Sequence, residues 1–197
     1  PLNSLSKKDF GNAIDLCAAP GGKAFQVLSK TNDIALNDVS KKRIELLKSN
    51  LKRLKFNAKI LNYDILKLKL DTKYDFIILD APCSAIGTIR RNPEIFFKRY
   101  GPNFESLLKN QAKMLNISAK LLNKKGILLY MVCSFFKSET TDQINKFLEI
   151  NKNFRIDKFS LDKNNELYGD IISKNYMRIL PTNIKGFKVD GYFAIYL

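Results

Sequence analysis

Short apolar segments alternate with amphipathic segments along the chain. Apolar runs bounded by polar or turn-forming residues predict strands at 12–17, 33–37, 58–61, 74–79, 126–132, 154–159 and 191–197. Helical spacing of apolar residues predicts helices at 23–30, 40–54, 103–122 and 138–149. Strands that alternate with helices predict an α/β fold, with a mostly parallel seven-stranded sheet and helices on both faces.

Polar or small residues follow several of these strands at the point where each one ends. They are the Gly21-Gly22 turn, Asp38, Asp64, Asp80 and Cys133. In open α/β sheets, ligands bind beyond the carboxyl ends of the strands. The shared position at strand ends therefore predicts one ligand-binding edge.

Length and composition are those of one globular domain spanning residues 1–197. The chain is 45% hydrophobic and 27% charged. No apolar run approaches the roughly 18 residues that a membrane-spanning helix needs. The first residues lack the charged-then-apolar layout of a signal peptide. We therefore expect a cytoplasmic protein with no membrane partner.

The chain is strongly basic, with 34 Lys and Arg against 19 Asp and Glu and a net charge of +15. Such an excess favours a polyanionic partner, first of all nucleic acid, because binding releases counterions from the phosphates. A lysine-rich surface that only aids solubility, or an AT-rich genome, would give the same composition. The basic helix over 40–55 is likewise either an RNA-binding face or a solvated surface.

Cysteine and histidine usage narrows the chemistry. The three cysteines, Cys17, Cys83 and Cys133, are too widely spaced for a zinc site and argue against a disulfide framework. Histidine is absent, which excludes Ser-His-Asp and Cys-His catalysis and histidine-metal sites. No metal is expected, and any acid–base catalysis must use carboxylates, Lys, Cys, Tyr or water.

The first motif, DLCAAPGGK, joins the first predicted strand to a helix. A P-loop would need Gly at 17 and Ser or Thr at 24, where the chain has Cys17 and Ala24, and the GxGxxG fingerprint is absent. S-adenosylmethionine remains as the ligand, unless the turn merely connects two elements. The predicted cofactor-binding residues of this loop are Cys17, Ala18, Ala19, Pro20, Gly21, Gly22 and Lys23.

Two further strand-end carboxylates fit the same ligand. Asp38 can accept hydrogen bonds from both ribose hydroxyls, although a helix N-cap is the alternative. Asp64 can accept from an adenine amino group, although a loop or capping role is equally compatible with its position.

The third motif, DAPCSAIG, follows the fourth strand, and TIRRNP comes directly after it. Proline stiffens this loop, which favours proximity of Asp80 and Cys83. Arg90 and Arg91 suit contacts with RNA phosphates or bases. Taken alone, Cys83 would be interpreted as a small buried hydrophobic residue.

The fourth motif, YMVCS, places Cys133 at the end of a buried strand. A cysteine there, near positive charge, can act as a thiolate; a core cysteine is the alternative. Cys17 lies inside the first strand–turn junction, so we interpret it as structural or cofactor-lining.

The segments CAAPGGK, DAPCSAIGTIRRNPE and YMVCS, with Asp38 and Asp64 between them, resemble the RNA cytosine-C5 methyltransferase family (Sun/NOL1/NOP2). The RRNPEI segment and the tail MRILPTNIKGFKVDGYFAIYL are most similar to the bacterial RsmB/Sun type, which methylates 16S ribosomal RNA. The resemblance implies a Rossmann-like class I S-adenosylmethionine-dependent fold. It also implies that the family's N-terminal RNA-binding, NusB-like region is absent from this sequence.

The resemblance assigns roles to four residues. Cys133 would attack C6 of the cytosine, and Cys83 would assist release of the product. Asp80 would contact N3 and N4 of the base, and Lys23 would stabilise charge nearby; both would also belong to the cofactor site. S-adenosylmethionine would be the cofactor and RNA with an unstacked cytosine the partner. We expect a monomer.

Three other functions are weighed against this one. The substrate could be transfer RNA, or the chain could be a non-catalytic RNA-binding or ribosome assembly factor that keeps the fold. Retention of both cysteines, Asp80 and Lys23 argues against a degenerate enzyme. Amino-group methyltransferases are disfavoured, because Cys83 stands where they carry an aromatic residue.

Overall fold

The computed structural model describes residues 2, 10–31, 33–67, 72–97, 103–157, 172–173, 175–184 and 186–197. The chain forms two compact units. The N-terminal unit comprises Pro1–Asp80 and Ile117–Leu129, and the C-terminal unit comprises Ala81–Asn116 and Tyr130–Leu197. Among the described residues, no helix combines the length and apolar character needed to cross a membrane.

Parallel strands form the core of the N-terminal unit. Their order is β3-β2-β1-β4, with β5 beside β4; the bounds are β1 Ala13–Asp15, β2 Ile34–Asn37, β3 Lys59–Leu61, β4 Tyr74–Asp80 and β5 Leu122–Val132. Ile14 lies opposite Ala35 on one side and Ile77 on the other. All residues of β1 and β2 are buried, which explains their continuous apolar runs. The predicted strands and their parallel arrangement are confirmed in this unit.

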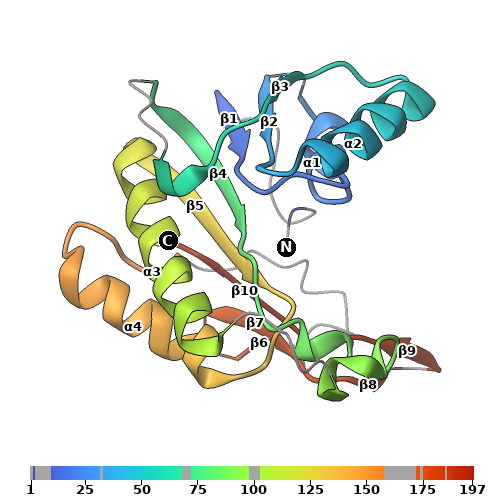
Figure 1. The fold of residues 1–197 in the computed structure, drawn as a ribbon. Coiled ribbons are helices and arrows are strands. Elements are labelled where there is room, and N and C mark those ends of the chain that lie inside the picture. The colour runs from blue at the N-terminus through green and yellow to red at the C-terminus, as the bar shows by residue number, and fades with distance from the viewer. Residues whose placement is uncertain are drawn as a thin grey trace. The chain divides into compact units, whose positions relative to one another are not determined.

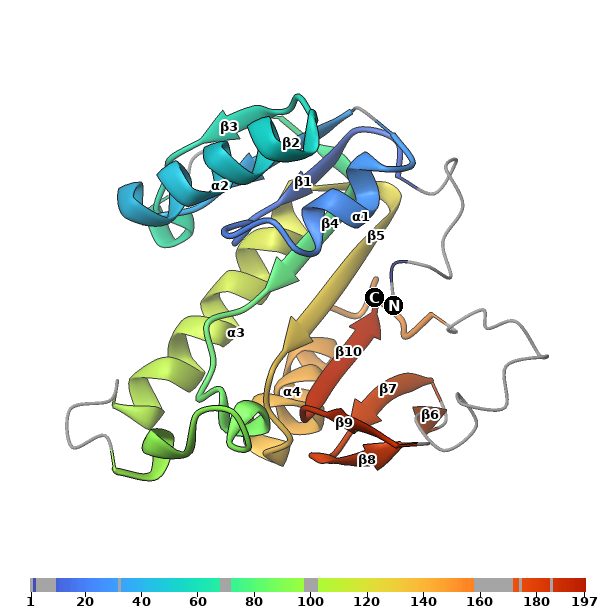
Figure 2. The ribbon, with the colours of Figure 1, turned by 90° about the vertical axis from the view of Figure 1, so that its right-hand side faces the viewer.

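Two helices of the N-terminal unit, α1 (Ala24–Leu28) and α2 (Lys41–Leu54), lie along the same side of β1–β3 (Figures 1 and 2). Ser40 caps α2 by accepting a hydrogen bond from the Arg43 amide at 3.3 Å. The helix buries one face and ends at Lys55, which is left-handed with φ 56°. Ser40 is therefore the N-cap residue of α2.

The helices of the C-terminal unit are α3 (Phe104–Leu121), most of which belongs to this unit, and α4 (Thr141–Ile150). Short 3₁₀ turns η4 (Ile86–Thr88), η5 (Pro93–Phe97) and η6 (Lys137–Glu139) connect the remaining segments. The predicted helices over 103–122 and 138–149 are thus confirmed, the second being divided between η6 and α4.

The strands of the C-terminal unit are the end of β5, β10 (Tyr192–Tyr196), β7 (Tyr176–Ile179) and β6 (Ile172–Ser173), in this order. β10 pairs antiparallel with β7, and β7 with β6. A separate antiparallel hairpin joins β8 (Thr182–Ile184) to β9 (Phe187–Val189), as Figure 2 shows. The predicted strand over 191–197 is confirmed as β10.

The predicted strand over 154–159 is wrong for the part that the structure describes. Residues 154–156 have no regular structure, and Asp157 makes only an isolated bridge to Tyr196; 158 and 159 lie outside the described residues. β7 pairs with β10 instead. The strands β6–β9, of two to four residues each, are too short for a periodic pattern to predict.

Candidate active site

The two glycines of the loop after β1 serve different purposes. Gly21 has φ +116°, and a Cβ there would lie 2.0 Å from the Phe25 ring. The Gly21 carbonyl accepts the Phe25 amide at 2.9 Å, which starts α1. A Cβ on Gly22 would meet no atom within 4 Å. Gly21 is therefore required by the fold, whereas Gly22 leaves open space above the loop.

Gly21→Ala should destabilise the protein by about 3 kcal/mol, because it adds both a strained φ and a clash with Phe25. In thermal unfolding, the midpoint should fall by roughly 10 °C for a chain of this size. Gly22→Ala is the matched control and should leave the midpoint unchanged. Equal midpoints for the two variants would contradict this account of the loop.

Hydrogen bonds hold the loop against the end of β2 and the start of α2. The Ala18 amide donates to the Asn37 carbonyl at 2.8 Å, and the Ala19 amide donates to Asp38 Oδ2 at 3.2 Å. The Arg43 guanidinium donates to the Ala19 carbonyl. The loop residues predicted to bind the cofactor are therefore fixed in place by their neighbours.

Asp38 is almost completely buried, with 2% of its surface exposed. Its Oδ1 accepts the Ser40 amide at 2.9 Å, and Oδ2 lies 3.3 Å from Arg43 Nη1. With the Ala19 bond, the carboxylate has three protein donors. Asp38 thus orders both the glycine loop and the entry to α2, and its contact with a ribose stays a prediction.

Asp64 lies apart from these contacts. Its Oδ1 accepts the Leu66 amide at 3.0 Å and so caps the short turn η3 (Ile65–Lys67). Its side chain is about one-third exposed. The structure therefore gives Asp64 a capping role, and its adenine contact stays a prediction.

Lys23 and Asp80 form an ion pair in the N-terminal unit. Asp15, at the end of β1, is 1% exposed and accepts the Cys17 amide at 3.1 Å. Burial, reinforced by the negative charge of Asp80, raises the pKa of Asp15 from 3.8 to about 7. Asp15 has no role predicted from its sequence context, although its position at a buried strand end, like that of Asp80, is the available signal.

Asp15→Asn should remove a pH dependence of stability. Below about pH 4 the carboxyl is protonated in both folded and unfolded chains. Between about pH 4 and 7 only the unfolded chain ionises, so the wild type should lose stability relative to Asp15→Asn by on the order of 4 kcal/mol. Urea unfolding of both proteins from acid to neutral pH measures this. A constant difference between them would show that Asp15 ionises normally.

Cys17 differs from the other two cysteines. Its thiol is partly buried, and burial together with the negative charge of Asp15 raises its pKa. It therefore keeps its proton at neutral pH and is a poor nucleophile. This supports the interpretation of Cys17 as structural or cofactor-lining.

In the C-terminal unit, Cys83 and Cys133 lie side by side although they are 50 positions apart in the sequence. Their Sγ atoms are 3.2 Å apart, well beyond the bond length of about 2.05 Å in a disulfide. The hydrogen bond to Cys133, followed by burial, raises the pKa of Cys83. The structure thus brings together the two thiols that the sequence analysis singled out.

A buried carboxylate that the sequence analysis left without a role lies behind the cysteines. Glu139 is 0% exposed and accepts hydrogen bonds from Ser84 and Ser134, the residues that follow Cys83 and Cys133. All of these residues belong to the C-terminal unit.

Arg90 and Arg91 are exposed and contact the segment that contains β8 and β9. Arg90 donates to the Thr182 carbonyl at 3.0 Å, and Arg91 Nε donates to Asp190 Oδ2 at 2.7 Å. This bond, followed by the negative charge of Asp190, raises the pKa of Arg91. The predicted RNA contacts of both arginines stay predictions.

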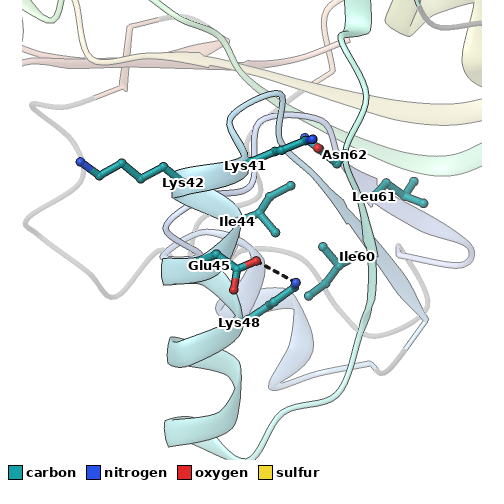
Figure 3. A pocket seen from close by; sticks show the side chains of 8 residues that line it. All are labelled: Lys41, Lys42, Ile44, Glu45, Lys48, Ile60, Leu61 and Asn62. Carbon is teal, nitrogen blue, oxygen red and sulfur yellow. Dashed lines mark hydrogen bonds and ion pairs between the residues drawn. The ribbon is translucent and has the colours of Figure 1, made fainter.

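A surface pocket of about 480 Å³ lies between α2 and β3 (Figure 3). Ile44 and Ile60 face each other across it, and Lys48 pairs with Glu45 at 2.8 Å. The lining residues are Lys41, Lys42, Ile44, Glu45, Lys48, Ile60, Leu61 and Asn62. None of the predicted cofactor residues lines this pocket.

Within the described ranges, no group of three or more Cys, Asp or Glu side chains could hold a metal ion.

Solved structures with similar folds define the class of protein. NSun6 from Pyrococcus horikoshii, solved with SFG, aligns with a TM-score of 0.78 and 27% identity, over 99% of this chain and 49% of that one. A methyltransferase homologue from the same organism aligns with a TM-score of 0.73 and 26% identity, over 100% of this chain and 64% of that one. The fold is the Rossmann-like class I fold of S-adenosylmethionine-dependent methyltransferases.

The family model for 16S rRNA methyltransferase RsmB/F matches residues 3–197. Ribosomal RNA small subunit methyltransferase B of Shewanella oneidensis is 38% identical over 149 residues, which cover 73% of this chain and 35% of that protein. The Serratia proteamaculans protein of the same name is 34% identical over 161 residues, with 79% and 37% covered. The chain belongs to the RsmB/F family and spans about a third of the length of these relatives.

Proposed function

We propose that this chain transfers a methyl group from S-adenosylmethionine to C5 of a cytosine in small-subunit ribosomal RNA. The observation that carries the proposal is the adjacency of Cys83 and Cys133, with Sγ atoms 3.2 Å apart. C5 of cytosine is a poor nucleophile until a thiolate adds to C6. An enzyme that activates the base in this way needs one thiol to attack, and a second thiol can assist release.

The residues of the N-terminal unit fit the proposed cofactor. Gly22 leaves open space above the loop, and loop amides suit a carboxylate group. The carboxylates of Asp38 and Asp80 suit hydroxyl or amine donors. When bound, S-adenosylmethionine supplies a methyl group made electrophilic by its sulfonium. A solved relative, NSun6, contains SFG, an analogue of this cofactor.

Cys133 carries the first step in our proposal. Its Sγ forms a bond to C6, and the electron pair of the C5–C6 double bond becomes available at C5. Cys83 keeps its proton at neutral pH because its pKa is raised. The Cys83 thiol can therefore donate a hydrogen bond to the sulfur of Cys133, which stabilises negative charge there.

In our proposal Asp80 contacts the cytosine base, and Lys23 balances the charge that develops there. We assign Asp80 to N3 and N4 of the cytosine, where charge accumulates as the thiolate adds. Only three positions along the chain separate Asp80 from Cys83. Lys23, paired with Asp80, would balance that charge.

Release completes the reaction. After C5 has gained its methyl group, water takes its proton, the C5–C6 double bond re-forms, and Cys133 leaves C6 as a thiolate. We assign Cys83 to assist this step by donating a hydrogen bond to the departing sulfur of Cys133. The chain has 34 basic against 19 acidic residues. The surplus basic side chains, together with Arg90 and Arg91, would bind the RNA phosphates.

Methyl transfer from labelled S-adenosylmethionine to purified RNAs tests the proposal. We expect label in unmethylated small-subunit ribosomal RNA, recovered as 5-methylcytidine by nucleoside mass spectrometry, and none in transfer RNA. Label in transfer RNA alone would overturn the substrate assignment. RNA binding without S-adenosylmethionine binding in calorimetry would instead identify a non-catalytic binding factor.

A further inference from the structure

Glu139 connects the two cysteine-bearing segments through one carboxylate. Oε1 accepts the Ser84 amide at 2.8 Å, and Oε2 accepts the Ser84 hydroxyl at 2.5 Å. The Ser134 hydroxyl also donates to Oε2, at 2.5 Å. Ser84 directly follows Cys83, and Ser134 directly follows Cys133. The same buried group therefore fixes the chain immediately after each thiol.

Glutamine side chains complete this arrangement from the helices. Gln111 of α3 is 0% exposed, and its Nε2 donates to Glu139 Oε1 at 3.0 Å and to the Pro82 carbonyl at 2.9 Å. Gln143 of α4 donates to Gln111 Oε1 at 3.4 Å. Cys83 is thus held on both sides, through the carbonyl before it and the amide after it.

The backbone of Glu139 is fixed as well. The Tyr130 hydroxyl, fully buried, donates to the Glu139 carbonyl at 2.8 Å. A buried carboxylate is costly unless hydrogen bonds satisfy it. Here four donors do so, and three of them belong to the residues that follow the cysteines. The groups that offset the cost of burying the Glu139 carboxylate are therefore mainly those whose positions determine where the thiols lie.

We infer that Glu139 is a positioning residue that holds Cys83 and Cys133 in the side-by-side geometry needed for thiol attack and release. It acts through Ser84 and Ser134, the residues that follow the two cysteines. The catalytic use of the two thiols rests on the proposed function, whereas the geometry that Glu139 maintains does not.

Oxidation of the thiols by diamide tests the geometry without RNA or cofactor. Diamide takes one hydrogen from each of two thiols, and a Cys83–Cys133 disulfide forms only if the sulfurs meet. We expect Glu139→Ala to slow this reaction by at least about tenfold, because the two thiols lose their preset orientation. Glu139→Gln keeps one acceptor oxygen, so its rate of disulfide formation should lie between those of the wild type and Glu139→Ala. Peptide mass spectrometry identifies the bond and excludes Cys17.

The exposed Glu149 of α4 offers a matched control. Glu149→Ala should form the disulfide at the wild-type rate. The alkylation rate of each variant corrects for thiol reactivity. The negative charge of Glu139 contributes to the raised pKa of Cys83, so its removal should speed alkylation. Slower disulfide formation in a variant that still unfolds at the wild-type temperature separates lost orientation of the thiols from general destabilisation.

Should Glu139→Ala not fold, Ser134→Ala and Ser84→Ala replace it. Ser134→Ala should slow disulfide formation more than Ser84→Ala does. In Ser84→Ala the backbone amide of residue 84 still donates to Glu139 Oε1. Disulfide rates unchanged in all these variants would overturn the inference. In methylation assays, kcat of Glu139→Ala should fall about 100-fold with unchanged affinity for S-adenosylmethionine. A wild type that methylates nothing would contradict the proposed function but leave the disulfide result standing.

Discussion

Cys133→Ala will lose all methyl transfer and form no covalent complex with RNA, whereas Cys83→Ala will accumulate a covalent complex that survives denaturing electrophoresis. The first variant lacks the nucleophile for C6. The second can attack and methylate but cannot release, so the bond between Sγ and C6 persists. Single-turnover methylation and gel mobility of labelled RNA measure both outcomes.

The side chains removed in these two variants are small, so a change in folding should not explain the results. Both thiols are partly buried and hydrogen-bonded to each other, so each variant should lose only on the order of 1 kcal/mol of stability, which thermal unfolding measures. An exchange of the two phenotypes, with Cys133→Ala trapping the complex, would reverse the roles. Full activity in either variant would remove that thiol from the mechanism.

Asp80→Asn should lower kcat by about 10²- to 10⁴-fold, the range usual for loss of a side chain that transfers or balances a proton. The variant keeps the size of the side chain but loses its charge and its ion pair with Lys23. Since Asp80 contributes to the raised pKa of Asp15, that pKa should fall towards its ordinary value. Single-turnover rates and a pH titration measure the two effects.

Asp33→Asn is the control for Asp80→Asn, since it neutralises an exposed carboxylate of the same unit. It should leave both the rate and the pKa of Asp15 unchanged. Wild-type turnover by Asp80→Asn would contradict the role proposed for Asp80, even if the pKa of Asp15 shifted.

The strands of the N-terminal unit could be predicted because their signal is local. Parallel strands covered on both faces have continuous apolar runs, and the polar residue at the end of each run marks the edge where ligands bind. Asp80 and Cys133 were found in this way. The short antiparallel strands β6–β9 carry no comparable pattern, so their existence depended on pairings that only the folded chain reveals.

The Glu139 network could not be predicted because it joins residues far apart in sequence. Ser84 and Glu139 are separated by 55 positions, and Gln111 and Glu139 by 28. One signal was available: Gln111 lies among the apolar residues of the helix predicted over 103–122. A buried amide needs a partner, so its position indicated a polar group inside the core without identifying it.

The partners of the charged side chains also could not be predicted from residue type alone. Asp38 is predicted to meet a ribose, and its carboxylate also contacts the Ala19 amide and Arg43. Arg91 was expected to meet RNA, and it pairs with Asp190, 99 positions away. Both residues lie where the sequence placed them, but their neighbours are determined by tertiary structure.

RNA that contains 5-fluorocytidine tests the central claim most directly. Fluorine at C5 replaces the proton that must leave, so the covalent intermediate cannot break down after methylation. Wild-type chain, S-adenosylmethionine and this RNA should give a stable complex, digested and analysed by peptide mass spectrometry. The account predicts a methylated fluorocytidine attached to the peptide that contains Cys133. Attachment at Cys83, or methylated RNA with no covalent complex, would contradict it.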